Sequence, residues 1–522
     1  MIRRPQKTKI SNKGPEARTR NLPAPVGGWN TRDSQARMRP EFALYLENLF
    51  PTAKTVDMRK GSVVHATGLP LTGKHLMAWV GPTSTKVFAC TDGGIYDVTT
   101  AGAVGASVST LTDGRCIHIN FNATGGSFLV VVNGVDQLRY YNGSTWTLVP
   151  TFTIGAGPST LASTDISYIN SFKRALFFIK KQSMSFYYLP VDQITGSVSV
   201  FPLGAIFSKG GYLVAMANWT FDGGVGLDDY TVFASSQGQL AVYKGTDPSS
   251  STTWALQGVY DLGSPLGARC FTKYGGDLLF LSTTGLWSMS KALVMSQDKD
   301  SGTVSSVINE AFSSAASSYG SQFGWQIAVC PTDNLLVVNV PITQFVTSHQ
   351  YVMNINTKAW TKFTNWNASS FELVTDQLYM TVGTTVVRCW EGGLDSGNSI
   401  TAYAKCAPQY LAPASSLKQI QLVKLTMTVE GVYAMNADVD MDFRDDTDYQ
   451  SPVFSGIALS YWNTGTYGDA EWGALPDVTR DWFTVTSGEG YAAAPRLRII
   501  SRDATIQWSA IDYAYVAGAI QG

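Results

Sequence analysis

The fold is decided by a repeated unit, and its clearest copy is FLVVVNGVDQLRYY, residues Phe128–Tyr141. Two apolar runs flank Asn133-Gly134, a dipeptide that favours the tight turn of a β-hairpin because both positions tolerate positive φ. The same order of apolar strand, turn and apolar strand recurs six more times. The other copies are Val87–Val98, Ala175–Leu189, Thr231–Lys244, Asp277–Met289, Gln326–Val338 and Gln377–Trp390.

The hairpins are evenly spaced. Their turns are centred near residues 93, 134, 182, 238, 285, 333 and 383, so the repeat is about 48 residues long. One strong hairpin per repeat of this length is typical of a β-propeller blade, whose open face only a neighbouring blade can cover. We therefore predict an all-β protein with a β-propeller of about seven blades, or six if one hairpin belongs to an insertion.

Changes of pattern at both ends of the repeats divide the chain into three parts. Residues 1–62 are expected to form an N-terminal basic arm followed by a short helix over Pro40–Leu49, because proline suits the first helical position. Residues 63–395 are expected to form the propeller, and the strand Ser62–Thr67 is expected to close its ring. Within it, the spacing of apolar residues predicts a helix in Ser301–Ser318.

Residues 396–522 have a different pattern of apolar and polar residues. Lys418–Glu430 alternates strictly between apolar and polar residues, which indicates a half-buried antiparallel strand. Arg496–Ile499 and Ile506–Tyr515 continue the alternation. We predict a C-terminal β-sandwich.

Composition and charge limit the class of protein. Hydrophobic residues make up 44% of the 522, charged residues only 15% and aromatic residues 12%, which favours a β-rich protein with extensive protein contacts. Residues 1–40 carry ten Lys or Arg against Glu16 and Asp33, a net charge of +8, so the rest carries −9 of the total −1. A cationic arm on an acidic body indicates a contact with a polyanion or an acidic partner surface, or else a solvated disordered tail. The candidate contact residues are Arg3, Arg4, Lys7, Lys9, Lys13, Arg18 and Arg20.

The six cysteines are scattered without a C-x-x-C pair, which indicates reduced, structural thiols. The N-terminus lacks the apolar core of a signal peptide, and no apolar run reaches about 18 residues. We therefore expect a protein made in the cytosol, with no membrane span.

The two segments that come nearest to catalytic or cofactor-binding motifs are both incomplete. Gly68–Lys74 resembles a phosphate-binding loop, but His75 replaces the Ser or Thr and a strand is expected where that loop needs a helix. Ser288–Lys291 spells S-x-x-K without its usual partner motifs. We expect no enzyme activity and no cofactor.

Metal sites are not expected either. Aspartates recur from Asp438 to Asp448, but Phe443 replaces the glycine of an EF-hand loop, so a solvated or lumen-facing strand edge is expected. The four histidines (His65, His75, His118, His349) have no close pair among acidic or thiol ligands, which argues against zinc.

Several segments resemble one family, the tail nozzle or packaged-DNA stabilisation proteins of short-tailed bacteriophages. They are LPAPVGGWNTRD (22–33), LENLFP (46–51), MRKGSVVHATG (58–68), LLVVNVP (335–341), YVMNINTKAWTKF (351–363), VVRCWEGGLDSG (386–397), GYAAAPRLRI (490–499) and WSAIDYAY (508–515). The basic arm has no counterpart in this resemblance.

The resemblance implies a structural virion protein without catalytic residues, arranged as a ring of six copies below the tail adaptor and portal. Such a ring retains the packaged double-stranded DNA and conducts it during ejection, without sequence-specific binding. A tail fibre or spike is a further partner that the resemblance implies. An acidic body suits a channel wall because like charge keeps DNA from adhering. Two alternatives remain: a propeller that binds or degrades host glycan, and a peripheral tail adaptor.

Overall fold

The computed structural model describes residues 17–222, 227–294, 302–444, 454–455, 477–478, 482–485 and 488–518. The chain forms two compact units. We call residues 30–32 and 59–400 the propeller unit, and residues 1–29, 33–58 and 401–522 the long-strand unit. The boundaries expected from the sequence fall after residues 62 and 395, whereas those of the compact units fall after residues 58 and 400.

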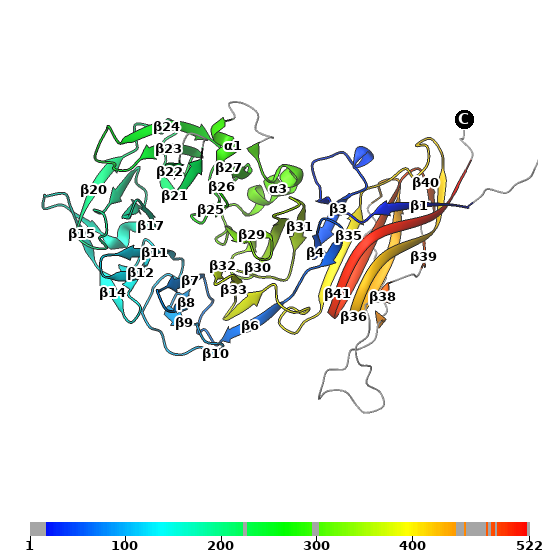
Figure 1. The fold of residues 1–522 in the computed structure, drawn as a ribbon, viewed down its shortest axis with the longest axis horizontal. Coiled ribbons are helices and arrows are strands. Elements are labelled where there is room, and N and C mark those ends of the chain that lie inside the picture. The colour runs from blue at the N-terminus through cyan, green and yellow to red at the C-terminus, as the bar shows by residue number, and fades with distance from the viewer. Residues whose placement is uncertain are drawn as a thin grey trace, which may run out of the picture. The chain divides into compact units, whose positions relative to one another are not determined.

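The propeller unit begins with three antiparallel blades (Figure 1). The first contains β7 (His75–Val80), β8 (Thr85–Thr91) and β9 (Gly94–Asp97). The second contains β11 (Ile117–Ala123), β12 (Gly126–Val132), β13 (Leu138–Tyr141) and β14 (Trp146–Val149). The third contains β17 (Ile166–Phe172), β18 (Ala175–Lys180), β19 (Ser185–Tyr188) and β20 (Ser197–Pro202). It is extended by β15 (Thr151–Ile154) and β16 (Thr160–Ala162), and the 3-10 turn η2 (Ser163–Asp165) follows β16.

The remaining strands of the propeller unit continue the pattern. The fourth blade contains β21 (Leu213–Asp222), β22 (Leu227–Ser235), β23 (Gln239–Gly245) and β24 (Trp254–Asp261), and the fifth contains β25 (Phe271–Tyr274), β26 (Asp277–Ser282) and β27 (Gly285–Ser288). Next come β28 (Gln326–Cys330), β29 (Leu335–Thr343), β30 (Thr347–Asn354) and β31 (Trp360–Phe363), which pair antiparallel in that order. The last blade contains β32 (Ser370–Val374), β33 (Gln377–Val382), β34 (Thr385–Cys389) and β6 (Ser62–Thr67), with β10 (Gly102–Ala103) at its edge.

These strands form a β-propeller, as predicted. In the described residues, six sheets stand by themselves as blades, and β28–β31 make a further four-stranded group between the fifth and last blades. The first strands contact one another in the order β7, β11, β17, β21, β25, β28, β32 and back to β7, which closes the ring. All seven hairpins expected from the sequence are present. The strand β6 pairs with β34, so the N-terminal strand of the propeller unit completes the last blade, as expected.

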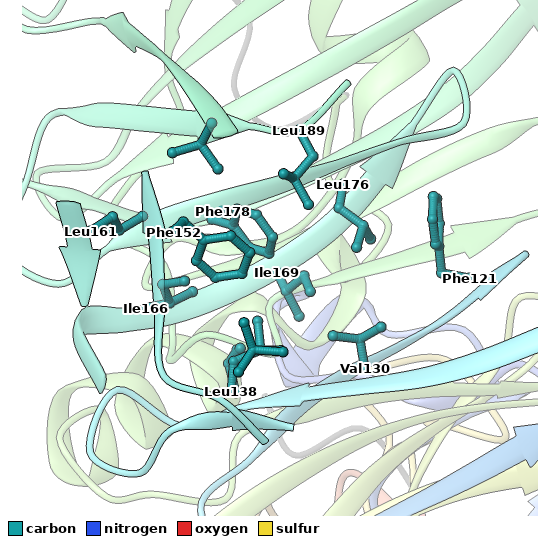
Figure 2. Packing of buried hydrophobic residues seen from close by; sticks show 13 residues of the cluster. Phe121, Val130, Leu138, Phe152, Leu161, Ile166, Ile169, Leu176, Phe178 and Leu189 are labelled. Atoms are coloured by element: carbon teal, nitrogen blue, oxygen red, sulfur yellow. The ribbon is translucent and has the colours of Figure 1, made fainter. Parts of the chain in front are cut away.

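The hydrophobic core lies between neighbouring blades. Figure 2 shows one cluster in which Phe121, Val130 and Leu138 of the second blade pack against Phe152 and Phe178 of the third-blade segment. The middle strands of the blades bury consecutive apolar residues, such as Leu129–Val132 of β12 and Leu278–Leu281 of β26, because both of their faces meet a neighbour, whereas edge strands such as β24 are mostly exposed. This packing is the physical reason for the continuous apolar runs of the hairpins.

The prediction of a helix over Pro40–Leu49 is wrong. The segment instead forms β3 (Phe42–Glu47) and β4 (Leu49–Pro51), separated by Asn48 at φ 56°. Strand β3 pairs with β35 (Ile400–Cys406). These long-range backbone hydrogen bonds outweigh the local helical spacing, because a helix of about ten residues is marginal by itself.

The helix expected within residues 301–318 is confirmed in its second half. The 3-10 turn η3 (Ser306–Ile308) leads into α3 (Asn309–Tyr319), whose Phe312 and Ala316 are buried. A second short helix, α1 (Met289–Val294), follows β27 and was not expected. Among the described residues, no helix is long and apolar enough to cross a membrane.

The long-strand unit is also all β. Its centre is the antiparallel pair β36 (Lys418–Met441) and β41 (Ala493–Ala517), and its strands are hydrogen-bonded in the order β2-β3-β35-β41-β36. Strand β1 (Ala17–Pro23) adds to β41. The smaller elements are β2 (Gly28–Trp29), η1 (Gln35–Arg37), β5 (Val56–Met58), β37 (Phe454–Ser455), β38 (Asp477–Val478), β39 (Trp482–Thr484) and β40 (Glu489–Gly490). Leu425, Met427 and Val429 are buried on β36, so the predicted alternation is confirmed.

Candidate functional site

A buried arginine stands where the propeller unit begins. The Arg59 side chain is fully buried, and its two terminal nitrogens donate to Asp395 Oδ1 at 2.9 Å and Oδ2 at 2.5 Å. The same nitrogens donate to the carbonyls of Lys60 at 3.0 Å and Thr364 at 2.9 Å. The buried charge therefore has a bidentate carboxylate partner and additional acceptors, as burial of a charge requires.

Aromatic rings complete this site, which we call the arginine clasp. The guanidinium carbon lies 5.0 Å from the ring centre of Trp366 and 5.5 Å from that of Phe363. The Trp366 indole N–H donates to Asp395 Oδ1 at 3.1 Å. The ring faces are electron-rich and favour a cation above them, so the tryptophan binds both members of the ion pair.

The clasp holds the strand that closes the ring. The backbone N–H of Gly61 donates to Gly392 O at 2.7 Å, and that of Ser62 donates to Leu394 O at 2.9 Å. A Cβ at Gly61 would lie only 1.9 Å from Leu394 O, so only glycine fits. Three segments that carry the family resemblance, residues 58–68, 351–363 and 386–397, contribute Arg59, Phe363 and Asp395 to this one site.

At the axis of the propeller, side-chain amides bind the open edges of the first strands. Asn120 of β11 donates to Ala78 O at 2.7 Å and accepts from Val80 N at 3.0 Å, both on β7. Gln326 of β28 contacts Phe371 of β32 in the same way, at 2.7 and 3.0 Å. Each amide reproduces the hydrogen bonds of a neighbouring strand, which satisfies backbone groups that the ring leaves unpaired.

The axis also holds a pair of histidines that are distant from each other in the sequence. His75 Nε2 lies 2.8 Å from His118 Nδ1, and His118 Nε2 lies 3.3 Å from Glu372 Oε1. Burial, followed by the nearby His118 and Arg269, holds the pKa of His75 well below its usual range. The two histidines are 43 residues apart, close to one repeat, which is the only sequence signal that relates them. In the described part of the chain, no group of three or more His, Cys, Asp or Glu residues could hold a metal.

A cavity of about 360 Å³ lies among the first strands β11, β17, β21 and β25. Its polar lining includes the amides of Asn120, Asn170 and Asn218 together with Lys273, and Tyr168 and Phe271 add aromatic surface. Asn170 donates to Met216 O at 2.9 Å, so at least two of these amides also bind backbone. The cavity has the size and lining of a small polar ligand site, although it has no pair of facing carboxylates.

Two residues of the predicted arm, Arg18 and Arg20, lie on β1, where they are exposed. They are opposite Tyr515 and Tyr513 of β41. The other five, Arg3, Arg4, Lys7, Lys9 and Lys13, lie outside the described residues.

The aspartates of β36 were expected at a solvated edge, which is wrong for Asp440. The residue is 4% exposed, and its carboxylate contacts Lys405 Nζ at 2.8 Å and Arg496 Nε at 3.2 Å. Arg496 also contacts Asp438 at 3.2 Å. The alternation seen in the sequence places these acids on one face, but cross-strand cations cover that face. Asp445, Asp446 and Asp448 lie outside the described residues.

The two near-matches to catalytic motifs have structural explanations. His75 begins the strand β7, so no helix follows Gly68–Lys74 to hold a phosphate. The Ser288 hydroxyl donates to Asp277 and accepts from Lys291 N at 3.4 Å, which caps the helix α1. All six cysteines are free and buried, in agreement with the prediction of structural thiols.

No protein-family model and no curated protein matches this chain. Among solved structures, BBS1N in complex with ARL6DN is 11% identical with a TM-score of 0.39, over 64% of this chain and 97% of that one. Raptor from Chaetomium thermophilum is 9% identical (TM-score 0.38, 63% and 30% covered), and Sqt1 from Saccharomyces cerevisiae is 10% identical (TM-score 0.34, 67% and 97% covered). Scores of this size carry no argument about function, so the assignment to the β-propeller class rests on the sheets described above.

Proposed function

We propose that this chain is a structural tail protein of a short-tailed bacteriophage, a ring-forming nozzle or hub that retains packaged DNA and conducts it during ejection. The arginine clasp carries the proposal. Three separate segments that resemble the nozzle family meet in one buried site, and chance similarities scattered along a chain have no reason to do so.

The distribution of charge is compatible with such a role. The body beyond residue 40 carries a net charge of −9, which reduces adhesion of DNA to a channel wall. Exposed basic residues at Arg18 and Arg20 suit an acidic neighbour such as a tail adaptor. In this proposal the protein is part of the virion, its own copies form the ring, and the residues named here do no chemistry.

Cryo-electron microscopy of purified particles that contain this chain tests the proposal. We expect closed rings of this chain, in the number of copies that closes the channel, along the path of the DNA. Particles that lack the chain should lose their DNA after packaging, measured as DNase-sensitive genome. A position away from the channel in intact particles, with the genome still retained in its absence, would refute the nozzle and favour a peripheral adaptor.

The axial cavity favours one second candidate, the binding of a host glycan by the propeller. Amide groups beside Tyr168 and Phe271 are the usual chemistry for a sugar. Calorimetric titration with the oligosaccharides of host lipopolysaccharide tests this candidate. Saturable binding that Phe271→Ala abolishes would support it, and no heat at millimolar sugar would exclude it.

A further inference from the structure

Four side chains form one continuous series of polar contacts across the closure of the propeller ring, two of them hydrogen bonds and the third a contact between an imidazole and a carboxylate. Ser370 Oγ lies 3.4 Å from His75 Nδ1, His75 Nε2 lies 2.8 Å from His118 Nδ1, and His118 Nε2 lies 3.3 Å from Glu372 Oε1. Ser370 also accepts from Leu76 N at 3.3 Å. The chain joins β7 of the first blade, β11 of the second and β32 of the last, so it bridges the junction where the ring closes.

We propose that the chain Ser370–His75–His118–Glu372 is an acid-operated latch, which stays closed with one added proton and opens with two. The proposal concerns the propeller itself and does not depend on the phage function. It follows from counting the protons that these atoms can share.

With both histidines neutral, every ring nitrogen is satisfied in only one arrangement. The Glu372 carboxylate lies 3.3 Å from His118 Nε2 and is an acceptor only, so its negative charge favours a proton on that nitrogen of His118. His118 Nδ1 is then an acceptor, so His75 must donate from Nε2. His75 Nδ1 accepts in turn from the Ser370 hydroxyl. The carboxylate at one end therefore sets the direction of the whole chain.

One added proton reverses the direction of the hydrogen bonds in this series and keeps every contact. If His118 becomes an imidazolium, it donates to Glu372 from Nε2 and to His75 from Nδ1. His75 remains neutral but moves its proton from Nε2 to Nδ1 and donates to Ser370 Oγ. The new positive charge lies against the Glu372 carboxylate, so the latch keeps all three contacts.

A second added proton cannot be accommodated in the contacts between Ser370 and Glu372. His75 Nε2–H and His118 Nδ1–H would then face each other across 2.8 Å with no acceptor between them. The charged groups that face His75 are His118 on β11 and Arg269 in the segment before β25, with Glu372 on β32 beyond His118. Burial and both cations oppose the charge, as the lowered pKa of His75 indicates. Protonation of His75 therefore requires it to leave β32, which opens the ring at its closure.

Nuclear magnetic resonance of the full chain labelled with ¹⁵N-histidine tests the latch, because there are only four histidines to assign. At pH 8 we expect His75 and His118 to carry their protons on Nε2. On acidification, His75 should move its proton to Nδ1 at the same midpoint at which His118 becomes charged. Independent titrations, or a His75 proton on Nδ1 at pH 8, would overturn the proposal.

The variant Glu372→Gln supplies a test that a merely structural role would not pass. Its amide can donate to His118 Nε2, so we expect both histidines to show a mixture of tautomers at pH 8 and the coupled step to move at least one pH unit lower. Hydrogen exchange of β7 and β32, corrected for intrinsic rates, should rise more than tenfold from pH 7 to the pH of the second step. A rise in β7 and β32 should persist in His349→Gln, which removes the separate acid sensitivity of His349 on β30, and exchange in β7 and β32 of this variant that is independent of pH would refute the latch.

Discussion

Removing the carboxylate of the arginine clasp should destabilise the propeller more than removing any exposed ion pair. Asp395 accepts two hydrogen bonds from Arg59, at 2.9 and 2.5 Å, and one from Trp366 at 3.1 Å. In Asp395→Ala the guanidinium loses its carboxylate partner while it remains buried. Breaking a buried pair by removing one partner costs about 3–5 kcal/mol, and we expect a loss of this size in the free energy of unfolding.

The assay is urea unfolding, followed by tryptophan fluorescence and by hydrogen exchange of β6, with the matched control Asp261→Ala. Lys209 and Asp261 form an ion pair whose side chains are 47% and 53% exposed. An exposed pair contributes about 0–1 kcal/mol, so this control should change little. The double variant Arg59→Met/Asp395→Ala should recover part of the loss, because it removes the uncompensated charge. Equal effects of Asp395→Ala and Asp261→Ala would refute the reasoning.

The remaining predictions concern a glycine, a histidine and the arm. Gly61→Ala should fail to close the last blade, because its Cβ would lie 1.9 Å from Leu394 O; proteolysis between the propeller blades should then be faster, and wild-type resistance would contradict it. Burial lowers the pKa of His349 to about 3, so the unfolded chain binds its proton first and stability falls with pH below about 6.5, by about 2 kcal/mol at pH 5; urea unfolding should show this slope reduced in His349→Gln, and an unchanged slope would exclude the residue. Deletion of residues 1–20 should weaken docking to the tail adaptor, measured by co-sedimentation, without lowering the melting temperature of the propeller; unchanged docking would remove the arm from that contact.

Local signals in the sequence were sufficient for the repeating part of the fold. A hairpin depends on apolar strands and on a turn residue between them, and both are visible within about 14 residues. Gly238, for example, lies at φ 84° in its turn, where a Cβ would meet Gly263 at 2.5 Å. The strand Ser62–Thr67 was also predictable because it is a short run with Val63, Val64 and Ala66 between Gly61 and Gly68. Local spacing misled only where long-range pairing decided the structure, as in Phe42–Glu47, which pairs with residues 403–406.

The sites were decided by tertiary structure. Arg59 and Asp395 are 336 residues apart, and no local pattern relates them. His75 and His118 meet because one repeat brings equivalent strands side by side at the axis, although neither residue has a distinctive neighbour in the sequence. Asp440 is buried because Lys405 and Arg496 come from other strands. The sequence by itself determined the hairpins, the turns and the propeller class, since these depend on contacts between near neighbours. Only the tertiary structure decided which charges are buried and which are paired, because burial and pairing depend on residues that are distant along the chain.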